Sequence, residues 1–194
     1  MGKDWGRSGA RFGLAAAVAL LLAACSSGPP LTIYDITPAH PPAARPLRAQ
    51  IQIGQPVASL DLDSERILVR DGLTLSTLPG ARWPQQLTSL FRQRLTASFQ
   101  NAGLTRSLAG GGASADYELD TDIRNFEVDA PTSEVHLDVA ARVVDLRSGR
   151  VVDVQIFTIR EPVTPIEAQA VSAALDHAAD ELMSKIVAFT ARTL

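Results

Sequence analysis

The segment EVHLDVAARV at residues 134–143, the turn Ser148-Gly149 and the segment VVDVQIFTI at residues 151–159 decide the fold of this 194-residue chain. Apolar residues occupy every second position of the first segment, and this period of two predicts a strand with one face in a core. The Ser-Gly turn then sends the chain back. The second segment is more apolar, as buried strands are, so we expect it at the centre of the sheet.

Further strands surround this hairpin. Residues 47–53 alternate in the same way, and Asp71-Gly72 joins two apolar runs as a β-hairpin turn does. The alternation that begins at Tyr117 changes phase near Arg124-Asn125, which indicates a β-bulge. The remaining strands are therefore expected at 31–36, 47–53, 66–70, 73–78 and 117–128.

Two helices complete the pattern. Pro84 opens the first, since proline suits the first helical position, and Gly103 ends it. Thr164 and Glu167 have the spacing of a capping box, so the second helix is expected over 165–192, to the end of the chain. The fold class predicted is α+β: a two-layer sandwich of a mostly antiparallel sheet with two long helices on one face.

The first 30 residues have the features of a targeting segment. Residues 1–12 are basic overall and residues 13–24 read GLAAAVALLLAA, the order found in signal peptides. The segment ends in Leu22-Ala23-Ala24-Cys25, which resembles the lipobox of bacterial lipoproteins, where the Cys is acylated before cleavage. The alternative is an ordinary signal peptide with an unrelated Cys.

The lipobox divides the chain into three parts: a signal peptide at 1–24, a lipidated tether at 25–30 and a single α/β domain at 31–194. Two or three acyl chains on Cys25 would hold the domain on a membrane, because one chain alone binds only reversibly. In enteric-type sorting, Asp after the lipidated Cys retains a lipoprotein in the inner membrane. Ser26 stands there instead, so we expect the outer membrane, with the domain in the periplasm.

No catalytic, cofactor or metal site is predicted. The net charge of −3 argues against a nucleic-acid partner, and the chain has neither a G-x-S-x-G elbow nor a P-loop. His177 and Glu181 lie one helical turn apart, but they supply only two ligands where zinc needs three or four. The acidic residues Asp116, Glu118, Asp120 and Asp122 fall on one face of a strand and fit its solvated face.

Short motifs that recur in one lipoprotein family are present in order after the lipobox. They are Tyr34-Asp35-Ile36, Leu60-Asp61 with Arg66-Ile67 and Arg70, Arg82-Trp83-Pro84, Phe126-Glu127 and Ala173-Ala174-Leu175. In this the chain resembles the ABC-type transport auxiliary lipoprotein family, which includes the lipoprotein subunit of paraquat-inducible, MCE-type transport systems. It departs from the family at 75–78, where an aromatic residue is often found, and at Phe189-Thr190, where many members have Trp.

The resemblance implies a non-catalytic component of a lipid transport system, anchored at Cys25 in the outer membrane. Its partners would be an MCE-domain protein, a permease and an ATPase, and Arg82-Trp83 is the candidate docking loop. Trp83 has an alternative role in packing. Two other functions stay open: an envelope assembly lipoprotein of outer-membrane biogenesis, and a periplasmic hydrolase with an unrecognised site. Self-association into a homo-oligomer, the lipid cargo and the direction of transport are left open.

Overall fold

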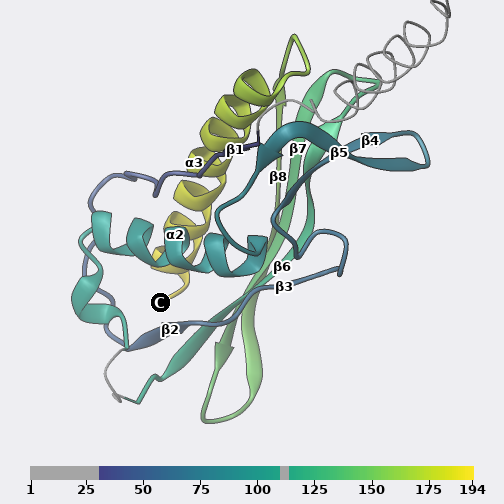
Figure 1. Ribbon diagram of the computed structural model, residues 1–194. Helices are drawn as coiled ribbons and strands as arrows, with labels where there is room; N and C mark the ends of the chain where they lie inside the picture. Colours follow the sequence, from purple (N-terminus) through teal and green to yellow (C-terminus); the bar gives the residue numbers. More distant parts are fainter. Residues whose placement is uncertain (1–30, 110–113) are drawn as a thin grey trace, which may run out of the picture. The chain divides into compact units, whose positions relative to one another are not determined.

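The computed structural model describes residues 31–109 and 114–194, and Figure 1 shows how their helices and strands are arranged. The predicted signal peptide and tether, with Cys25, lie outside the described residues. The elements are β1 (Thr32–Ile33), β2 (Ile51–Ile53), β3 (Val57–Ala58), β4 (Arg66–Asp71), β5 (Thr74–Arg82), α2 (Leu87–Asn101), a 3-10 turn (Thr105–Ser107), β6 (Tyr117–Asp129), β7 (Glu134–Asp145), β8 (Arg150–Pro162) and α3 (Ala168–Thr193).

One eight-stranded sheet is built around β6. Its order is β1-β5-β4-β6-β7-β8, and β2 and β3 pair with the part of β6 that β4 leaves free. Strand β7 is antiparallel to β6, whereas β2, β3 and β4 all run parallel to it along successive stretches. The sheet is therefore mixed, and the prediction of a mostly antiparallel sheet was wrong. The long connection through α2 brings the chain back in the direction of β4, which a short hairpin cannot do.

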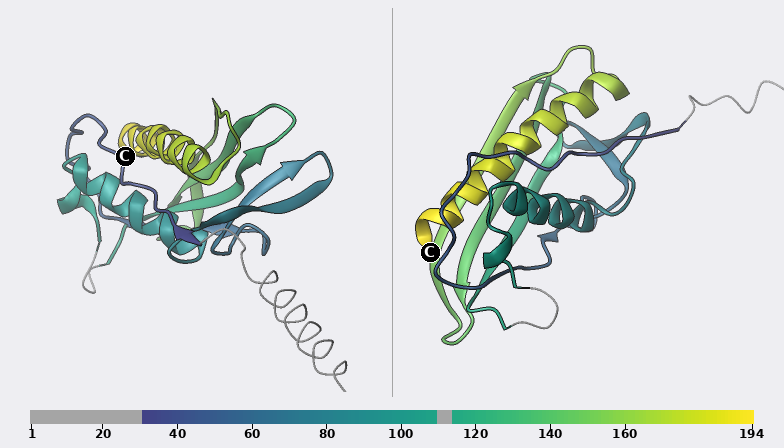
Figure 2. Two further views of the ribbon diagram at one scale, coloured as in Figure 1. Left: turned by 45° about the horizontal axis from the view of Figure 1, so that its top comes forward. Right: turned by 90° about the vertical axis from the view of Figure 1, so that its left-hand side faces the viewer.

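Both helices lie on the same side of the sheet, as the α+β prediction required (Figure 2). The side chains of β7 alternate between buried and half-buried, so only the helix-covered face of this strand enters the core. Helix α3 buries one long stripe of its surface, including Leu175, Leu182 and Ile186. We call the opposite side of the sheet the open face.

The two helices begin later than predicted, at Leu87 and Ala168 instead of at the prolines. In α2 the side chain of Asp63, from the loop before β4, accepts hydrogen bonds from the Thr88 backbone N–H at 3.1 Å and from its hydroxyl at 2.8 Å. This carboxylate replaces a local cap. The predicted capping box of α3 does not form, because Glu167 is itself the N-cap residue and its side chain makes no capping hydrogen bond.

Two local predictions are confirmed. Gly72 has φ of +59° in the turn between β4 and β5, a conformation that glycine adopts without strain. The pairing of β6 with β7 shifts register between Ile123 and Asn125, where the bulge was expected.

The predicted central position of residues 151–159 was wrong: this segment is part of β8, at the edge of the sheet.

A candidate docking surface on the edge strand

Strand β8 exposes a row of aliphatic side chains at the edge of the sheet. Its outer edge pairs with no other strand of the described residues. About half of each side chain is exposed at Val151 (54%), Val152 (48%), Val154 (55%) and Ile156 (52%). An exposed apolar edge strand of this kind is a template for pairing with another chain, and natural proteins usually protect such edges.

The pairing of β8 with β7 shows which face these side chains occupy. Phe157 pairs with the buried Val139, and both point toward the helices. One residue earlier, Ile156 pairs with Ala140 and Val154 with Arg142, so both aliphatic side chains point to the open face. The helix-facing positions at the start of β8 carry polar residues instead, Asp153 and Gln155. The apolar phase of this strand therefore reverses between Ile156 and Phe157.

Acidic side chains of β6 lie on the same open face and are separated from this apolar row by β7, which places Arg142 between Asp120 and Val154. Across the two strands, Glu118 lies opposite Val144 of β7, Asp120 opposite Arg142, and Asp122 opposite Ala140. Burial raises the pKa of Asp120, and its hydrogen bond with Glu118 and the charge of Glu118 raise it further. Beyond Asp122, its strand partner Val57 of β3 is 61% exposed. The docking surface is defined here as this set: Val57, Glu118, Asp120, Asp122, Val151, Val154 and Ile156.

The fourth predicted member of the acidic row, Asp116, lies apart from this set. It precedes β6, and its carboxylate accepts hydrogen bonds from the Gln50 backbone N–H at 3.0 Å and from Arg147 at 2.8 Å. These two contacts lower the pKa of Asp116. Asp116 thus links the start of β6 to the turn between β7 and β8 and takes no part in the docking surface.

A shallow groove runs along the outer side of β8, where it meets α3. It encloses about 380 Å³ and is lined by Ile156, Phe157, Lys185, Ala188 and Arg192, among others. Lys185 forms an ion pair with Glu181 at 2.6 Å. The edge of β8 therefore presents aliphatic side chains on its open face and basic groups on its helix face, so an added strand would meet two different chemistries.

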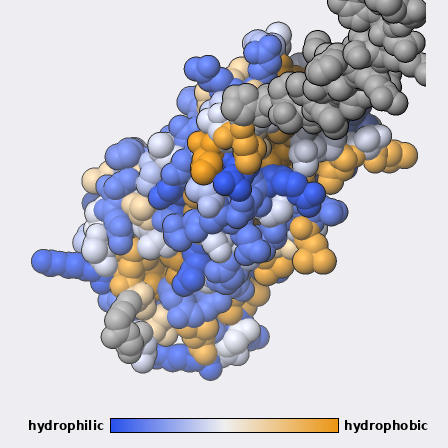
Figure 3. Space-filling model, viewed as in Figure 1, coloured by the Kyte–Doolittle hydropathy of each residue, from blue (hydrophilic) through white to orange (hydrophobic). Residues whose placement is uncertain are grey.

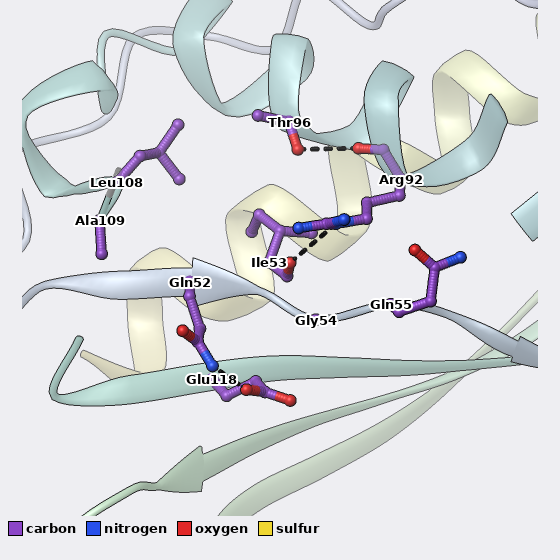
Figure 4. A pocket seen from close by; sticks show the side chains of 9 residues that line it. All are labelled: Gln52, Ile53, Gly54, Gln55, Arg92, Thr96, Leu108, Ala109 and Glu118. Carbon is purple, nitrogen blue, oxygen red and sulfur yellow. Dashed lines mark hydrogen bonds between the residues drawn. The ribbon is translucent and has the colours of Figure 1, made fainter. Parts of the chain in front are cut away.

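Figure 4 shows a second hollow, of about 340 Å³, between α2 and β2. Arg92 of α2 reaches across it and donates from Nε to the Ile53 carbonyl at 3.1 Å. The side chain of Gln52 points away from α2 and donates to Glu118 of β6. Amide, guanidinium and carboxylate groups form much of its lining, so this hollow does not offer an acyl chain an apolar enclosure.

The predicted docking residues Arg82 and Trp83 lie where β5 ends. Arg82 is partly exposed, and its guanidinium pairs with Glu65 at 3.2 Å. The indole of Trp83 is only 1% exposed and makes an edge-to-face contact with Phe126, with ring centroids 6.0 Å apart. Of these two residues, only Arg82 presents its side chain at the surface, and a docking role for the pair stays a prediction.

Several motif residues meet each other in the fold. Trp83 packs on Phe126, and Arg70 forms two hydrogen bonds with Glu127, at 2.5 and 3.1 Å. The Glu127 side chain is 2% exposed, so this ion pair is buried on the carboxylate side. The hydrogen bond with Glu127 raises the pKa of Arg70. These motifs thus hold β4, the end of β5 and β6 together, and the sequence alone does not reveal the pairings.

In the described residues, no helix is both long and apolar enough to cross a membrane. The same residues contain no group of three or more His, Cys, Asp or Glu side chains placed to hold a metal ion. Sequence reasoning assigned the aliphatic row of β8 to the interior. The adjacent pair Ile156-Phe157, where the alternation breaks, was the signal of the phase reversal.

Comparison with known proteins supports the resemblance. An uncharacterized protein of Bradyrhizobium diazoefficiens is 29% identical over 163 residues, which are 81% of this chain and 44% of that protein, so the chain spans less than half of that relative. The crystal structure of a Xanthomonas campestris protein covers 84% of this chain and 95% of its own, with 29% identity and a TM-score of 0.78. A hypothetical protein of Chlamydia trachomatis shares the fold at 12% identity, over 75% of this chain and 98% of its own, with a TM-score of 0.52.

The model of one family, described as the ABC-type transport auxiliary lipoprotein component, matches residues 31–187. This range begins one residue before β1 and ends within the last turns of α3, so it includes the whole sheet. The chain therefore belongs to the ABC-type transport auxiliary lipoprotein component family.

Proposed function

We propose that this protein is a non-catalytic lipoprotein, anchored at Cys25 in the outer membrane, that docks the periplasmic assembly of an MCE-type ABC transport system. The observation that carries the docking role is the half-exposed aliphatic row of β8 at the free edge of the sheet. Family membership supports the association with an ABC system. The lipobox and Ser26 support the anchor and the choice of membrane.

The docking surface suits a particular partner. A partner strand that pairs with the free edge of β8 would place alternate side chains on the open face, beside Val154 and Ile156. A partner strand at this edge is separated from β6 by β8 and β7, so Glu118, Asp120 and Asp122 would act on it only through long-range attraction of basic groups, which favours a fast encounter. We therefore expect an MCE-domain partner to present an extended segment with aliphatic and basic residues.

The candidate docking surface and the entry of the chain into the domain lie toward opposite ends of the sheet. Strand β6 pairs with β2 near its beginning and with β4 at its end, so the turn of the β4–β5 hairpin and the turn of the β7–β8 hairpin lie at opposite ends of β6 (Figure 1). Its 13 residues span about 43 Å at ~3.3 Å per residue. Val151 and Val154 lie toward the β7–β8 turn, far from the hairpin beside which the chain enters β1.

Photo-cross-linking in cells tests the docking role. The residue Val154 is replaced by p-benzoylphenylalanine, and the covalent adducts are identified by mass spectrometry. We expect an adduct with the MCE-domain protein of the same system. The matched control is Leu60, which is 92% exposed in the loop before β4 and should give no such adduct. An adduct with a β-barrel assembly protein would instead support the envelope assembly function, and an adduct with the same chain would show self-association.

The Cys25→Ser variant tests the anchor. Without the thiol no acyl chain can be added, so the variant should accumulate as an unprocessed or mis-sorted precursor. Fractionation of membranes by density, with the wild-type protein beside it, reports both the processing and the membrane. Wild-type protein in the inner-membrane fraction would contradict the outer-membrane assignment without affecting the docking role.

Arg82 and Trp83 are kept as secondary docking residues, and two variants separate their roles. Arg82→Ala removes a partly exposed cation and should weaken partner binding without a change in melting temperature. Trp83→Ala removes a buried ring and should lower stability by ~3–5 kcal/mol, the range for large aromatic truncations in a core. Unchanged partner affinity in both variants, measured well below the melting temperature, would remove this loop from the docking role.

A further inference from the structure

We infer that the tip of the β4–β5 hairpin rests on the lipid bilayer that holds the anchor, with Leu73 inserted into its surface. This inference rests on the proposed acylation of Cys25. It adds a second membrane contact, made by a side chain of the folded domain.

The first observation is the exposure of Leu73. Its side chain is 104% exposed, directly after Gly72 in the turn, where polar residues are usual. Leu75, on the same hairpin, is 36% exposed. Figure 3 shows this hairpin end as an apolar projection at the right-hand edge of the molecule. A single exposed leucine is common on protein surfaces, and it is the position of this hairpin that distinguishes Leu73.

The second observation is the direction in which the chain enters the domain. Strand β1 runs parallel to β5, with Thr32 opposite Ala81 and Ile33 opposite Arg82. Going backward from β1 therefore means going toward the start of β5 at Thr74, next to the hairpin tip. Leu31 and Ile33, on this route, are 59% and 57% exposed.

The length of the tether limits how far the anchor can lie from the domain. Six steps separate Cys25 from Leu31, and an extended chain covers about 21 Å in that number. Continuing the register of β1 places Leu31 opposite Gly80, and the six residues from Gly80 back to Thr74 span about 20 Å. An anchor at Cys25 can thus reach the level of the hairpin tip and hardly beyond it. A bilayer that receives the acyl chains then lies within reach of Leu73.

This geometry favours a bilayer over a protein as the occupant. The hairpin tip lies at the end of β6 opposite to the docking surface, where the tether keeps the domain close to the membrane. Stable attachment to membranes commonly combines acyl chains with a second signal. Leu73, with Leu31, Ile33 and Leu75 near the same path, would supply that signal and fix the orientation of the domain.

The experiment uses the full mature lipoprotein with Leu73→Cys, labelled with the polarity-sensitive dye NBD and reconstituted in phosphatidylethanolamine–phosphatidylglycerol vesicles. Cys25 is the only natural cysteine, and acylation consumes its thiol, so the introduced thiol is the only reactive one. We expect a blue-shifted emission and strong quenching by doxyl-labelled lipids. The matched control is Leu60→Cys, since Leu60 is also an exposed leucine but lies before the other end of β4.

Each outcome decides between the proposals. Vesicle flotation with quenching at position 73 and not at 60 supports the inference. Flotation with equally weak quenching at both positions overturns it and leaves the anchor intact. A blue shift that grows with protein concentration, without lipid quenching, assigns the tip to a second copy and also overturns it. Failure to float removes the anchor and overturns this inference, while cross-linking at Val154 still tests the docking role.

Discussion

The two halves of β8 carry similar apolar residues on opposite faces, and only the second half buries them. In the second half, Phe157 and Ile159 lie under α3, and Phe157 makes an edge-to-face contact with Phe189 at 5.9 Å. In the first half, the aliphatic residues Val154 and Ile156 point to the open face and stay half exposed. Coverage by the helices is not the only cause of this difference. The helix-facing residues of the first half, Asp153 and Gln155, are polar.

The two halves of this strand therefore contribute to different properties: the covered half to stability, and the exposed half to the proposed partner binding. Residues buried by α3 contribute to folding, because their removal leaves a cavity. Residues that stay exposed after folding contribute little to stability, and a contiguous exposed apolar set marks an interaction site. Substitutions on the two halves should therefore change different measurements.

The largest effect is expected from Leu182→Asp in α3, the helix that covers the second half of β8. Leu182 is fully buried, and a carboxylate there has no partner of opposite charge in the stripe it belongs to. A charge buried without a partner costs several kcal/mol, a large part of the ~5–15 kcal/mol that stabilises a typical domain. Circular dichroism should show loss of the cooperative melt. A melt equal to that of wild type would show that α3 does not cover the sheet.

Phe157→Ala tests the covered half directly. The ring is 5% exposed, so its removal should lower the free energy of unfolding by ~3–5 kcal/mol. Urea denaturation measures this change, and partner binding should persist below the new midpoint. A loss under 1 kcal/mol would mean that both halves of β8 are equally uncovered.

Ile156→Asp tests the exposed half at the adjacent position. Because the side chain is already half exposed, stability should change by no more than about 0.5 kcal/mol. Affinity for the docked partner should fall at least tenfold, since a carboxylate would replace an apolar contact at the edge that the partner strand is proposed to pair with. The same substitution at Leu60 is the control, with neither property changed. Destabilisation comparable to that of Phe157→Ala would place Ile156 in the core.

The smallest effect concerns the end of β8, where a carboxylate oxygen of Glu161 lies 2.7 Å from His177 Nδ1 in a hydrogen bond. This hydrogen bond, together with the charge of Glu161, raises the pKa of His177 above its usual value near 6.5. A raised pKa in the folded state stabilises the protein below about pH 6.5, and the contribution disappears as pH rises through the folded-state pKa.

An NMR titration of the histidine ring protons measures this shift, and Glu161→Gln should return the pKa of His177 toward 6.5. His136 serves as the internal reference, because burial, and then the charge of Arg160, lowers its pKa. An unchanged His177 titration in the variant would contradict the assigned cause.

Much of the fold follows from local patterns in the sequence. The turn at Gly72, the bulge before Asn125 and the two amphipathic helices each depend on residues close together in the chain, and all four were predicted. The mixed sheet depends on contacts such as Gln52 with Glu118, which are 66 residues apart. The alternation of apolar residues within a segment does not show which distant segment pairs with it. The prediction was therefore a mostly antiparallel sheet, and the parallel pairs of β6 were missed.

The docking surface was harder to predict than the fold for a related reason. Alternation shows that Val154 and Phe157 face opposite sides, but it does not show which side α3 covers. An apolar segment such as 151–159 therefore fits a central strand and an exposed edge equally well. The motifs Arg70 and Glu127 were recognised separately, and only the folded chain shows that they form one ion pair.

The position of β6 has a consequence for the order in which the chain folds. Strands β2, β3 and β4 all precede β6 in sequence and all pair with it. When the chain emerges from its N-terminus, these three strands appear before the strand with which they pair. Until Asp129 follows, only the β4–β5 hairpin can close by local contacts. The unpaired segments before it then stay exposed to non-native contacts for the longest time.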